Sequence, residues 1–208
     1  MIRTERLSKV TGRRTVLSEV TFAVEKGDAV AITGPPGSGK STLLRILATL
    51  SQPTSGRVEI AGIDVTARPF DARKKVYLSG GVGLGCHDMT LLEYLRFVAA
   101  TRTSGRPRNA ANLAPLIARI GLDAARSVAT LTESERRLVA MAASIASRAE
   151  VLLFDQPLAG LDMPAIECCS ALMSEARERG AAILAAAGVD APPSAAWNRR
   201  IHLETVGV

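Results

Sequence analysis

The chain has 208 residues, of which 47% are hydrophobic and 22% charged, and its net charge is +6. This length suits one domain, or one core with a smaller lobe, and permits a sizeable buried interior. No apolar stretch approaches the roughly 20 residues needed to span a bilayer, and Met1–Arg6 has no signal-peptide pattern, so we expect a cytosolic protein. With one Trp, two Tyr and four Phe, the chain offers no aromatic stacking platform, and nucleic acid is not a predicted partner.

Alternating apolar and polar residues predict strands near the amino terminus, around Thr15–Val24 and again at Arg57–Ile60. Turns are expected at Lys26–Asp28 and Thr54–Gly56, where a glycine accompanies polar residues. The apolar run Ala29–Ile32 predicts a further strand between them. The short alternating runs indicate an antiparallel β patch near the amino terminus.

The middle of the chain, from about Met89 to Ala149, has a helical pattern. Thr90–Glu93 has the spacing of a capping box and precedes the apolar run Tyr94–Val98. The polar, basic segment Thr101–Asn112 contains a glycine and a proline and is predicted to be a loop. We therefore predict a helical subdomain over about residues 88–148.

The run Val151–Phe154 is entirely apolar and ends on Asp155, which is typical of a parallel strand buried on both faces. A helical pattern follows from about Pro164 to Arg179, Gly180 stops it, and Ala181–Leu184 predicts the next strand. This order predicts an α/β fold with a mainly parallel sheet core, the antiparallel β patch and the inserted helical subdomain, all in one domain.

The segment Gly34–Thr42 matches GxxxxGKS between a predicted strand and the helical pattern Ser41–Leu47. Its glycines let successive backbone N–H groups point at one anion, Lys40 can reach the outer phosphates, and the Ser41 hydroxyl can take a Mg²⁺ position. The alternative is a glycine-rich turn that binds nothing. The predicted phosphate-binding residues are Gly34, Pro35, Pro36, Gly37, Ser38, Gly39, Lys40, Ser41 and Thr42.

Asp155 supplies the expected second half of a nucleotide site. It ends a predicted parallel strand, and the carboxyl edge of such a sheet is where a carboxylate can hold the water shell of Mg²⁺. The alternative is an aspartate that caps a following helix. Ser41 and Asp155 are therefore the predicted metal-binding residues.

With these motifs the chain resembles the nucleotide-binding subunits of ABC transporters over nearly its whole length. The matching segments are the phosphate loop, the turn Gln52–Gly56 with Gly62 beyond it, Leu131–Ala142 at the family's signature segment, Val151–Asp155, and the subunit-contacting loop Leu158–Asp162. The short length and abbreviated middle lobe are most similar to the ATPase subunits of small exporters, such as the haem exporter linked to cytochrome c maturation. The resemblance implies a P-loop NTPase of ABC type with ATP and Mg²⁺ as cofactors.

Two catalytic positions depart from the family's pattern. The glutamate that acts as general base is Gln156 here, and the family's histidine falls at Gly188. A glutamine can orient a water but cannot accept its proton, and a positioned acid–base group contributes about 10²–10⁴ in rate. Without the histidine, an electrostatic stabiliser of the transition state is missing.

Two binding positions depart as well. The glutamine that senses Mg²⁺ and the membrane subunit would fall near Ser79 or Gly80, and neither residue can replace it. The aromatic residue that stacks on adenine would fall near Val10 or Thr11, so a stacking contribution of about 1–3 kcal/mol is expected to be lost.

The signature itself, normally Leu-Ser-Gly-Gly-Gln, is Leu-Thr-Glu-Ser-Glu at Leu131–Glu135. Thr132 and Glu135 have the spacing of a capping box, so their side chains are expected to occupy N–H groups that grip phosphate in the family. Glu133 and Glu135 also bring negative charge to a place meant for an anion, which is expected to weaken closure over a triphosphate.

The losses around an intact phosphate loop predict an ATP-binding subunit of an ABC transporter complex with little or no hydrolysis of its own. The implied partners are an integral membrane permease and a second, more complete ABC ATPase subunit. They would hold the protein at the cytoplasmic face of the inner or plasma membrane. Two alternatives stay open: an ordinary transport ATPase in which Gln156 positions water, and a soluble ABC-type regulatory or scaffold protein without a permease.

Cys86, Cys168 and Cys169 have no metal-ligand spacing and are predicted to be reduced structural thiols. Basic clusters such as Arg13–Arg14 and Arg73–Lys75 are expected to be solvated faces, or alternatively to lie near anionic lipid headgroups.

Overall fold

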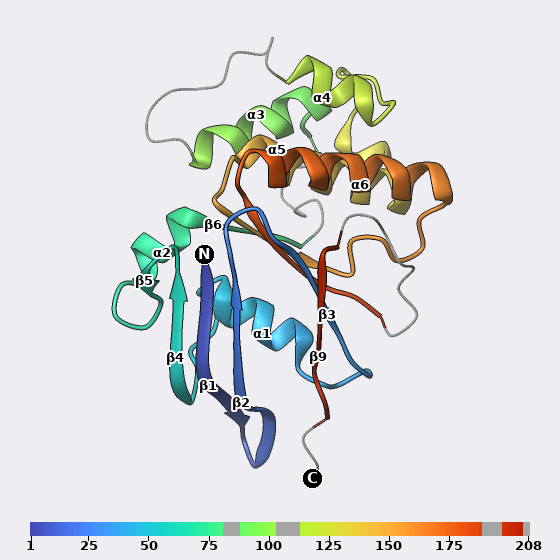
Figure 1. Ribbon diagram of the computed structural model, residues 1–208. Coiled ribbons are helices and arrows are strands. Elements are labelled where there is room, and N and C mark those ends of the chain that lie inside the picture. Colours follow the sequence, from blue (N-terminus) through green and yellow to red (C-terminus); the bar gives the residue numbers. More distant parts are fainter. Residues whose placement is uncertain (81–87, 103–112, 189–196, 206–208) are drawn as a thin grey trace.

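The computed structural model of the chain describes residues 1–80, 88–102, 113–188 and 197–205, which form two sheets and a set of helices (Figure 1). The strands are β1 (Ile2–Thr11), β2 (Arg14–Val24), β3 (Ala29–Thr33), β4 (Ser55–Ile60), β5 (Ile63–Asp64), β6 (Val76–Ser79), β7 (Val151–Asp155), β8 (Ala182–Ala186) and β9 (Arg199–His202). The helices are α1 (Lys40–Leu47), α2 (Pro69–Lys75), α3 (Leu91–Arg102), α4 (Ala114–Arg119), the 3-10 helix η2 (Val128–Thr130), α5 (Glu133–Ser147) and α6 (Met163–Glu178).

The two sheets confirm the predicted α/β fold class. One is a parallel sheet with the strand order β6-β7-β8-β3-β9. The other is an antiparallel sheet with the order β2-β1-β4-β5, drawn from the first third of the chain. Parallel neighbours need long crossover connections, and the helices supply them.

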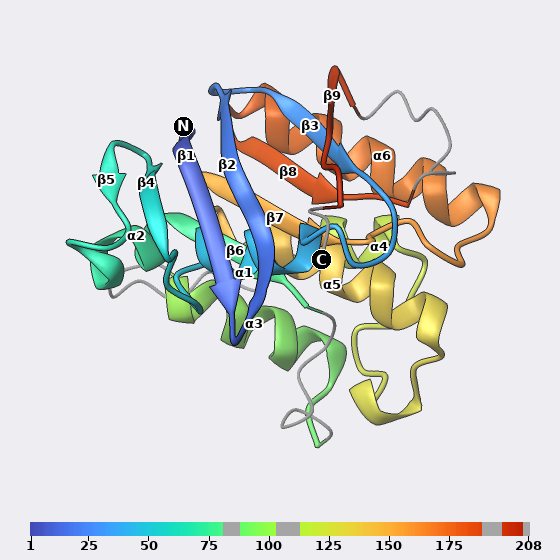
Figure 2. The same ribbon diagram turned by 90° about the horizontal axis from the view of Figure 1, so that it is seen from below.

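The central strands of the parallel sheet are apolar because both of their faces are covered. On β7, Val151 and Leu153 belong to a core shared with α1 and the antiparallel sheet. Leu152 and Phe154 alternate with them and belong to a second core that includes residues of α3, α5 and α6. Figures 1 and 2 show these two layers on opposite sides of the sheet. Burial of each such side chain stabilises the fold by about 1.5–3 kcal/mol.

Helix α1 connects the phosphate loop to the core between the two sheets. Its buried side chains are Leu43, Leu44, Ile46 and Leu47. These four are fully enclosed, so the start of α1 is held at a fixed place at the carboxyl edge of the parallel sheet. A rigid support of this kind is what a binding loop requires.

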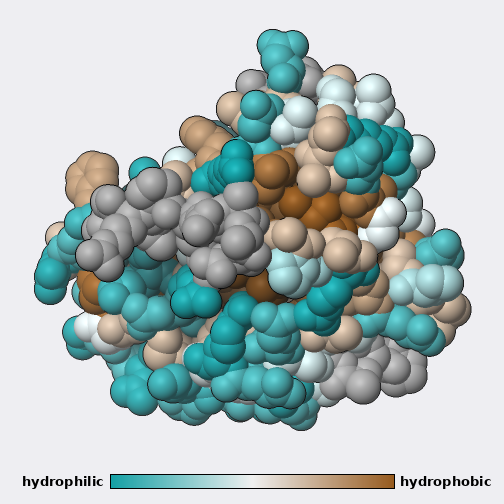
Figure 3. All heavy atoms as spheres, turned by 90° about the horizontal axis from the view of Figure 1, so that it is seen from above, coloured by the Kyte–Doolittle hydropathy of each residue, from teal (hydrophilic) through white to brown (hydrophobic). Residues whose placement is uncertain are grey.

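The middle of the chain is helical, as predicted, and it covers one face of the parallel sheet. Thr90 and Glu93 form the expected reciprocal cap: Glu93 Oε2 accepts the Thr90 N–H at 2.8 Å, and Thr90 Oγ1 accepts the Glu93 N–H at 3.3 Å. Figure 3 shows this face from above, with mostly hydrophilic side chains and an apolar patch near its middle. In the described part of the chain, none of the helices has the length and apolarity to cross a membrane.

Two predicted boundaries were wrong by a few residues. Thr101 and Arg102 belong to α3, whereas the rest of the predicted loop, 103–112, lies outside the described residues. Ser55 and Gly56 belong to β4 rather than to a turn, because Ser55 pairs with Ser8 on β1. At β4, pairing with β1 extended the strand over residues that locally favour a turn.

The cysteines of α6 fit the prediction of reduced structural thiols. Cys168 and Cys169 are free, and burial raises the pKa of Cys169 to about 12. Burial also raises the pKa of Cys168, against a smaller opposing effect of Arg119. Cys86 lies outside the described residues.

Candidate nucleotide-binding site

The predicted phosphate loop connects β3 to α1 and has no room for side chains at two of its glycines. A Cβ atom on Gly34 would lie 2.3 Å from the Leu203 carbonyl oxygen and 2.7 Å from Ser38 Oγ. On Gly39 it would lie 2.7 Å from the Val16 carbonyl oxygen, on β2. Both glycines have positive φ, 149° and 90°, which other residues rarely adopt. The loop is therefore tightly wound against β2 and the chain after β9.

The loop leaves a row of N–H groups at the start of α1. Leu43 is the first residue there whose N–H bonds within the helix, to the Gly39 carbonyl oxygen at 2.8 Å. The N–H groups of residues 40–42 precede it and have no intrahelical acceptor. Gly39 takes the N-cap position without a side chain that could satisfy them. These donors, together with the positive end of the helix dipole, suit an anion.

The Lys40 side chain folds back over the loop. Its ammonium group donates to the carbonyl oxygens of Gly34 and Pro35 at 2.7 and 2.8 Å, and to Ser38 Oγ at 3.2 Å. An ammonium group has three donors, so these acceptors account for all of them. The proline carbonyl thus contributes to holding the lysine within the loop.

Ser41 and Asp155, the predicted metal ligands, lie at the same edge of the parallel sheet. Asp155 pairs in register with Ala186 on β8, and Ala186 pairs with Ile32 on β3. Asp155 is therefore two strands from the strand that enters the loop, about 10 Å at the usual strand spacing. Both side chains are exposed. Two oxygen ligands fit Mg²⁺, which keeps several waters and binds through few protein groups and substrate phosphates.

The described residues contain no cluster of three or more His, Cys, Asp or Glu that could hold a metal by itself.

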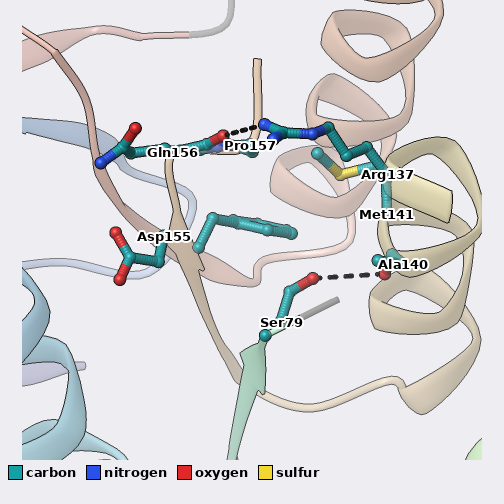
Figure 4. A pocket seen from close by; sticks show the side chains of 9 residues that line it. Ser79, Arg137, Ala140, Met141, Asp155, Gln156 and Pro157 are labelled. Atoms are coloured by element: carbon teal, nitrogen blue, oxygen red, sulfur yellow. Dashed lines mark hydrogen bonds between the residues drawn. The ribbon is translucent and has the colours of Figure 1, made fainter. Parts of the chain in front are cut away.

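Gln156 follows Asp155 in a left-handed backbone conformation, with φ of 51°. Its N–H donates to the Ala186 carbonyl oxygen at 2.9 Å, and its own carbonyl oxygen accepts a hydrogen bond from Arg137 Nη1 at 3.3 Å. This conformation costs a non-glycine residue about 1–2 kcal/mol, and the two contacts hold it in place. In Figure 4 the side chains of Asp155 and Gln156 project to the same side, away from Arg137.

A cavity of about 370 Å³ lies next to these residues. It is bounded by the end of β6, one face of α5 and the end of β7, and Figure 4 shows its lining. Ser79 and Gly80, where the family's glutamine would fall, line this cavity. The Ser79 hydroxyl donates to the Ala140 carbonyl oxygen at 3.5 Å, so it faces α5 (Figure 4).

Gly188 lies just beyond β8 and shares a second cavity, of about 350 Å³, with Gln156. A Cβ atom on Gly188 would meet nothing within 4 Å. Among the described residues, the predicted histidine position therefore has space for a Cβ atom.

The segment Leu131–Glu135 forms the predicted capping box at the start of α5. Thr132 Oγ1 accepts the Glu135 N–H at 3.3 Å, and Glu135 Oε2 accepts the Thr132 N–H at 2.8 Å. The pKa of Glu135 is lowered, chiefly by the hydrogen bond from the Thr132 N–H and then by Arg126. Two of the N–H groups at this helix end are thus occupied by the chain's own side chains.

The expected excess of negative charge at this helix end needs correction. Arg126 binds the Glu135 carboxylate through two hydrogen bonds, at 2.6 and 3.0 Å. Arg137 pairs with Glu133 at 3.3 Å. Each carboxylate therefore has an arginine partner, and the repulsion of an anion is weaker than two free charges would produce.

The loop Leu158–Asp162 combines one buried anchor with one helix cap. Leu158 is buried in the helical core, and Asp162 accepts the Ala165 N–H at 3.0 Å at the start of α6. Ala159 and Gly160 between them are exposed. The loop is thus fixed at both ends and presents its middle to solvent.

Val10 and Thr11, where the sequence places the family's adenine-stacking residue, are the last two residues of β1. Val10 is 39% exposed, and Thr11 is exposed as well. Neither residue offers an aromatic face.

Arg126 and Arg137 are the site residues that sequence reasoning missed. Arg137 could have been found, because it lies four residues after Glu133 on a predicted helix. Arg126 had no such signal, since it reaches Glu135 from outside the helix.

The phosphate loop, the strand-end carboxylate and the two-sheet fold together define a nucleotide-binding protein of the P-loop type. Residues 17–159 match the family described as "ABC transporter", which is more than half of the chain. The chain therefore belongs to this family, as an ABC transporter ATP-binding subunit.

Known relatives include both exporters and importers. The chain is 33% identical over 189 residues to a cytochrome c biogenesis ATP-binding export protein of Cupriavidus pinatubonensis, covering 89% of this chain and 82% of that protein. It is also 33% identical over 165 residues to a molybdate/tungstate import ATP-binding protein of Pyrococcus horikoshii, covering 78% of this chain. The chain spans about half the length of that import relative, 47%.

Among solved structures, the post-hydrolysis dimer of an ATP-binding cassette bound to ADP and Pi is similar, with a TM-score of 0.81. The alignment covers all of this chain and 97% of that one at 24% identity, so it supports the fold. ATP with Mg²⁺, the predicted cofactors, are those of the ABC ATPase family.

Proposed function

We propose that this ATP-binding subunit binds Mg-ATP and hydrolyses it little or not at all on its own. The observation that supports the proposal is a complete phosphate loop together with Gln156 and Gly188, the residues that the family resemblance puts at the two catalytic positions. The loop has its glycines, its lysine and its free N–H groups in place.

In this proposal, residues 34–42 bind the phosphates through backbone N–H groups and Lys40. Ser41 and Asp155 hold Mg²⁺, which when bound neutralises charge on the phosphate oxygens. Gln156 can orient a water by hydrogen bond, because its backbone is fixed by Ala186 and Arg137. It has no site for the proton that the water must lose, and Gly188 offers no group to the γ-phosphate.

The test is to measure ATP affinity and phosphate release on the same protein. We expect saturable ATP binding with turnover far below about 1 s⁻¹, the lower end of typical enzyme rates. Lys40→Ala should abolish ATP binding. The control is Lys26→Ala, which should leave ATP binding unchanged, because Lys26 lies just before the amino end of β3, at the edge of the sheet opposite the loop. Turnover near or above that rate would favour an ordinary transport ATPase in which Gln156 suffices, and absence of ATP binding would refute the proposal.

We also propose that the whole chain is one ATP-binding domain, with a helical subdomain over about 88–148, that works at the cytoplasmic face of a membrane. Its partners would be a permease and a second, more complete ABC ATPase subunit. The exposed middle of the Leu158–Asp162 loop and the apolar patch on the helical face (Figure 3) support contacts with other subunits. Affinity purification from native membranes tests this. Recovery of only soluble, unpartnered chain would favour the regulatory or scaffold alternative.

A further inference from the structure

Arg14 lies beside the phosphate loop. It is the first residue of β2 and pairs with Thr11 across the two-residue turn of the β1–β2 hairpin. Its Nη2 atom is 3.4 Å from the position that a Cβ atom on Gly37 would occupy. Gly37 is in the middle of the loop, so the guanidinium reaches the segment that offers N–H groups to phosphate.

The placement of Arg14 is fixed by the strand that carries it. Two and three residues further along β2, the Val16 carbonyl oxygen and the Leu17 side chain lie against the loop at Gly39, 2.7 and 2.6 Å from its Cβ position. Leu17 is buried in the core. The start of β2 therefore runs along the loop from Gly37 to Gly39, and this packing holds Arg14 at the exposed end of the strand.

The surroundings of Arg14 favour an anion. Among the described residues its side chain makes no hydrogen bond or ion pair, and both Arg14 and Gly37 are exposed. The neighbouring loop presents backbone N–H groups, the ammonium group of Lys40 and the positive end of α1, all of the same sign as the guanidinium. Like charges brought together destabilise a protein unless an anion joins them.

We propose that Arg14 binds the phosphate chain of the nucleotide and replaces part of the affinity that the absent aromatic platform would have given. This inference rests on the proposed function of the loop. A guanidinium can donate two parallel hydrogen bonds to phosphate oxygens, which makes such contacts strong. Because this contact is to phosphate, its contribution to the affinity does not depend on which base the nucleotide carries. Val10 and Thr11, at the other end of the same hairpin turn, add no stacking of their own.

The competing role for the same side chain is to stack its planar guanidinium on the adenine ring. The two roles differ in the ligands they affect. A phosphate contact strengthens binding of ATP, GTP and inorganic tripolyphosphate alike, whereas a stacking contact leaves tripolyphosphate unaffected.

The experiment measures the dissociation constants of ATP, GTP and tripolyphosphate by titration calorimetry at low salt. It compares the full chain with Arg14→Ala, Arg14→Lys and the control Arg13→Ala, which changes the neighbouring cation of the same hairpin. We expect Arg14→Ala to weaken all three ligands by about 10- to 100-fold and Arg14→Lys to weaken them less. Arg13→Ala should change them by less than about twofold, and the loss at Arg14 should shrink as salt rises.

Three results would overturn the inference: unchanged affinities in Arg14→Ala, an equal loss in Arg13→Ala, or a loss confined to ATP and GTP. The thermal midpoint of each ligand-free variant shows whether the fold is intact, and Arg14→Lys keeps the test valid if Arg14→Ala unfolds. Lys40→Ala separates the two proposals. If the starting protein does not bind ATP, the proposed function fails; if it binds ATP, Lys40→Ala abolishes that binding and Arg14→Ala does not weaken it, only the role of Arg14 fails.

Discussion

Placing a glutamate and a histidine at the two proposed catalytic positions, 156 and 188, should raise the rate of ATP hydrolysis. The double change Gln156→Glu and Gly188→His is compatible with the structure at both positions. Glutamate has the size of glutamine, and the backbone of residue 156 is held by main-chain contacts to Ala186 and Arg137 that do not involve its side chain. At Gly188, an added Cβ atom meets none of the described residues within 4 Å, so the first atom of a histidine side chain fits there.

The expected magnitude follows from the chemistry that each group supplies. A positioned general base contributes about 10²–10⁴ in rate, so Gln156→Glu alone should raise turnover by at least about 100-fold. A donor aimed at developing negative charge contributes a further factor of about 10²–10³, which is the upper expectation for Gly188→His. The new glutamate is next to Asp155, but both positions are exposed, so their repulsion is of order 1 kcal/mol and does not cancel the gain.

The assay is phosphate release at saturating ATP, with ATP affinity measured in parallel for each variant. Gln156→Met is the matched control, since it has a similar length but no proton acceptor, and it should stay at the starting rate. If the double variant binds ATP as well as the starting protein yet turns over no faster, the missing base and histidine are not what limits hydrolysis, and the reasoning is refuted.

Three further outcomes are expected. Thr11→Tyr should raise ATP affinity by roughly 5- to 150-fold without changing tripolyphosphate binding, because it adds a face for adenine worth about 1–3 kcal/mol; equal gains for both ligands would contradict this. Glu135→Gln should lower the free energy of unfolding by about 1–2 kcal/mol at pH 7, measured with urea, because the bidentate charge pair with Arg126 is lost. Since the pKa of Glu135 is lowered in the folded protein, its charged form stabilises the fold above the ordinary value of 4.5. The difference between the two proteins should therefore disappear as the pH falls below that value, and a difference independent of pH would contradict the assignment. Cys169 should resist alkylation at pH 8 until the protein unfolds, because burial raises its pKa to about 12; rapid labelling of its peptide in the native state would contradict this.

Local patterns were enough to predict the parts of the site that depend on neighbours in the chain. The loop Gly34–Thr42, the strand that ends on Asp155, and both threonine–glutamate capping boxes lie where the sequence predicted them. Each depends on residues within a few positions of one another, so the spacing of glycines, apolar side chains and caps carries the information. The α/β class followed from the order of these elements.

Contacts between distant segments were decided only by the tertiary structure. β9 joins β3 as a neighbouring strand although Arg199–His202 has little apolar pattern. The charge of Glu135 looked unopposed in sequence, yet Arg126, from outside helix α5, pairs with it in the fold.

The same holds for Arg14, which reads in sequence as one of several exposed basic residues and in the structure lies beside Gly37. The sequence shows which side chains are charged. Which residues lie next to each charge depends on how the strands and helices pack their apolar faces together. The sequence by itself therefore determined which groups are available for binding a nucleotide, and the tertiary structure decided which of them meet, because ionic and hydrogen-bond contacts act only over a few ångströms.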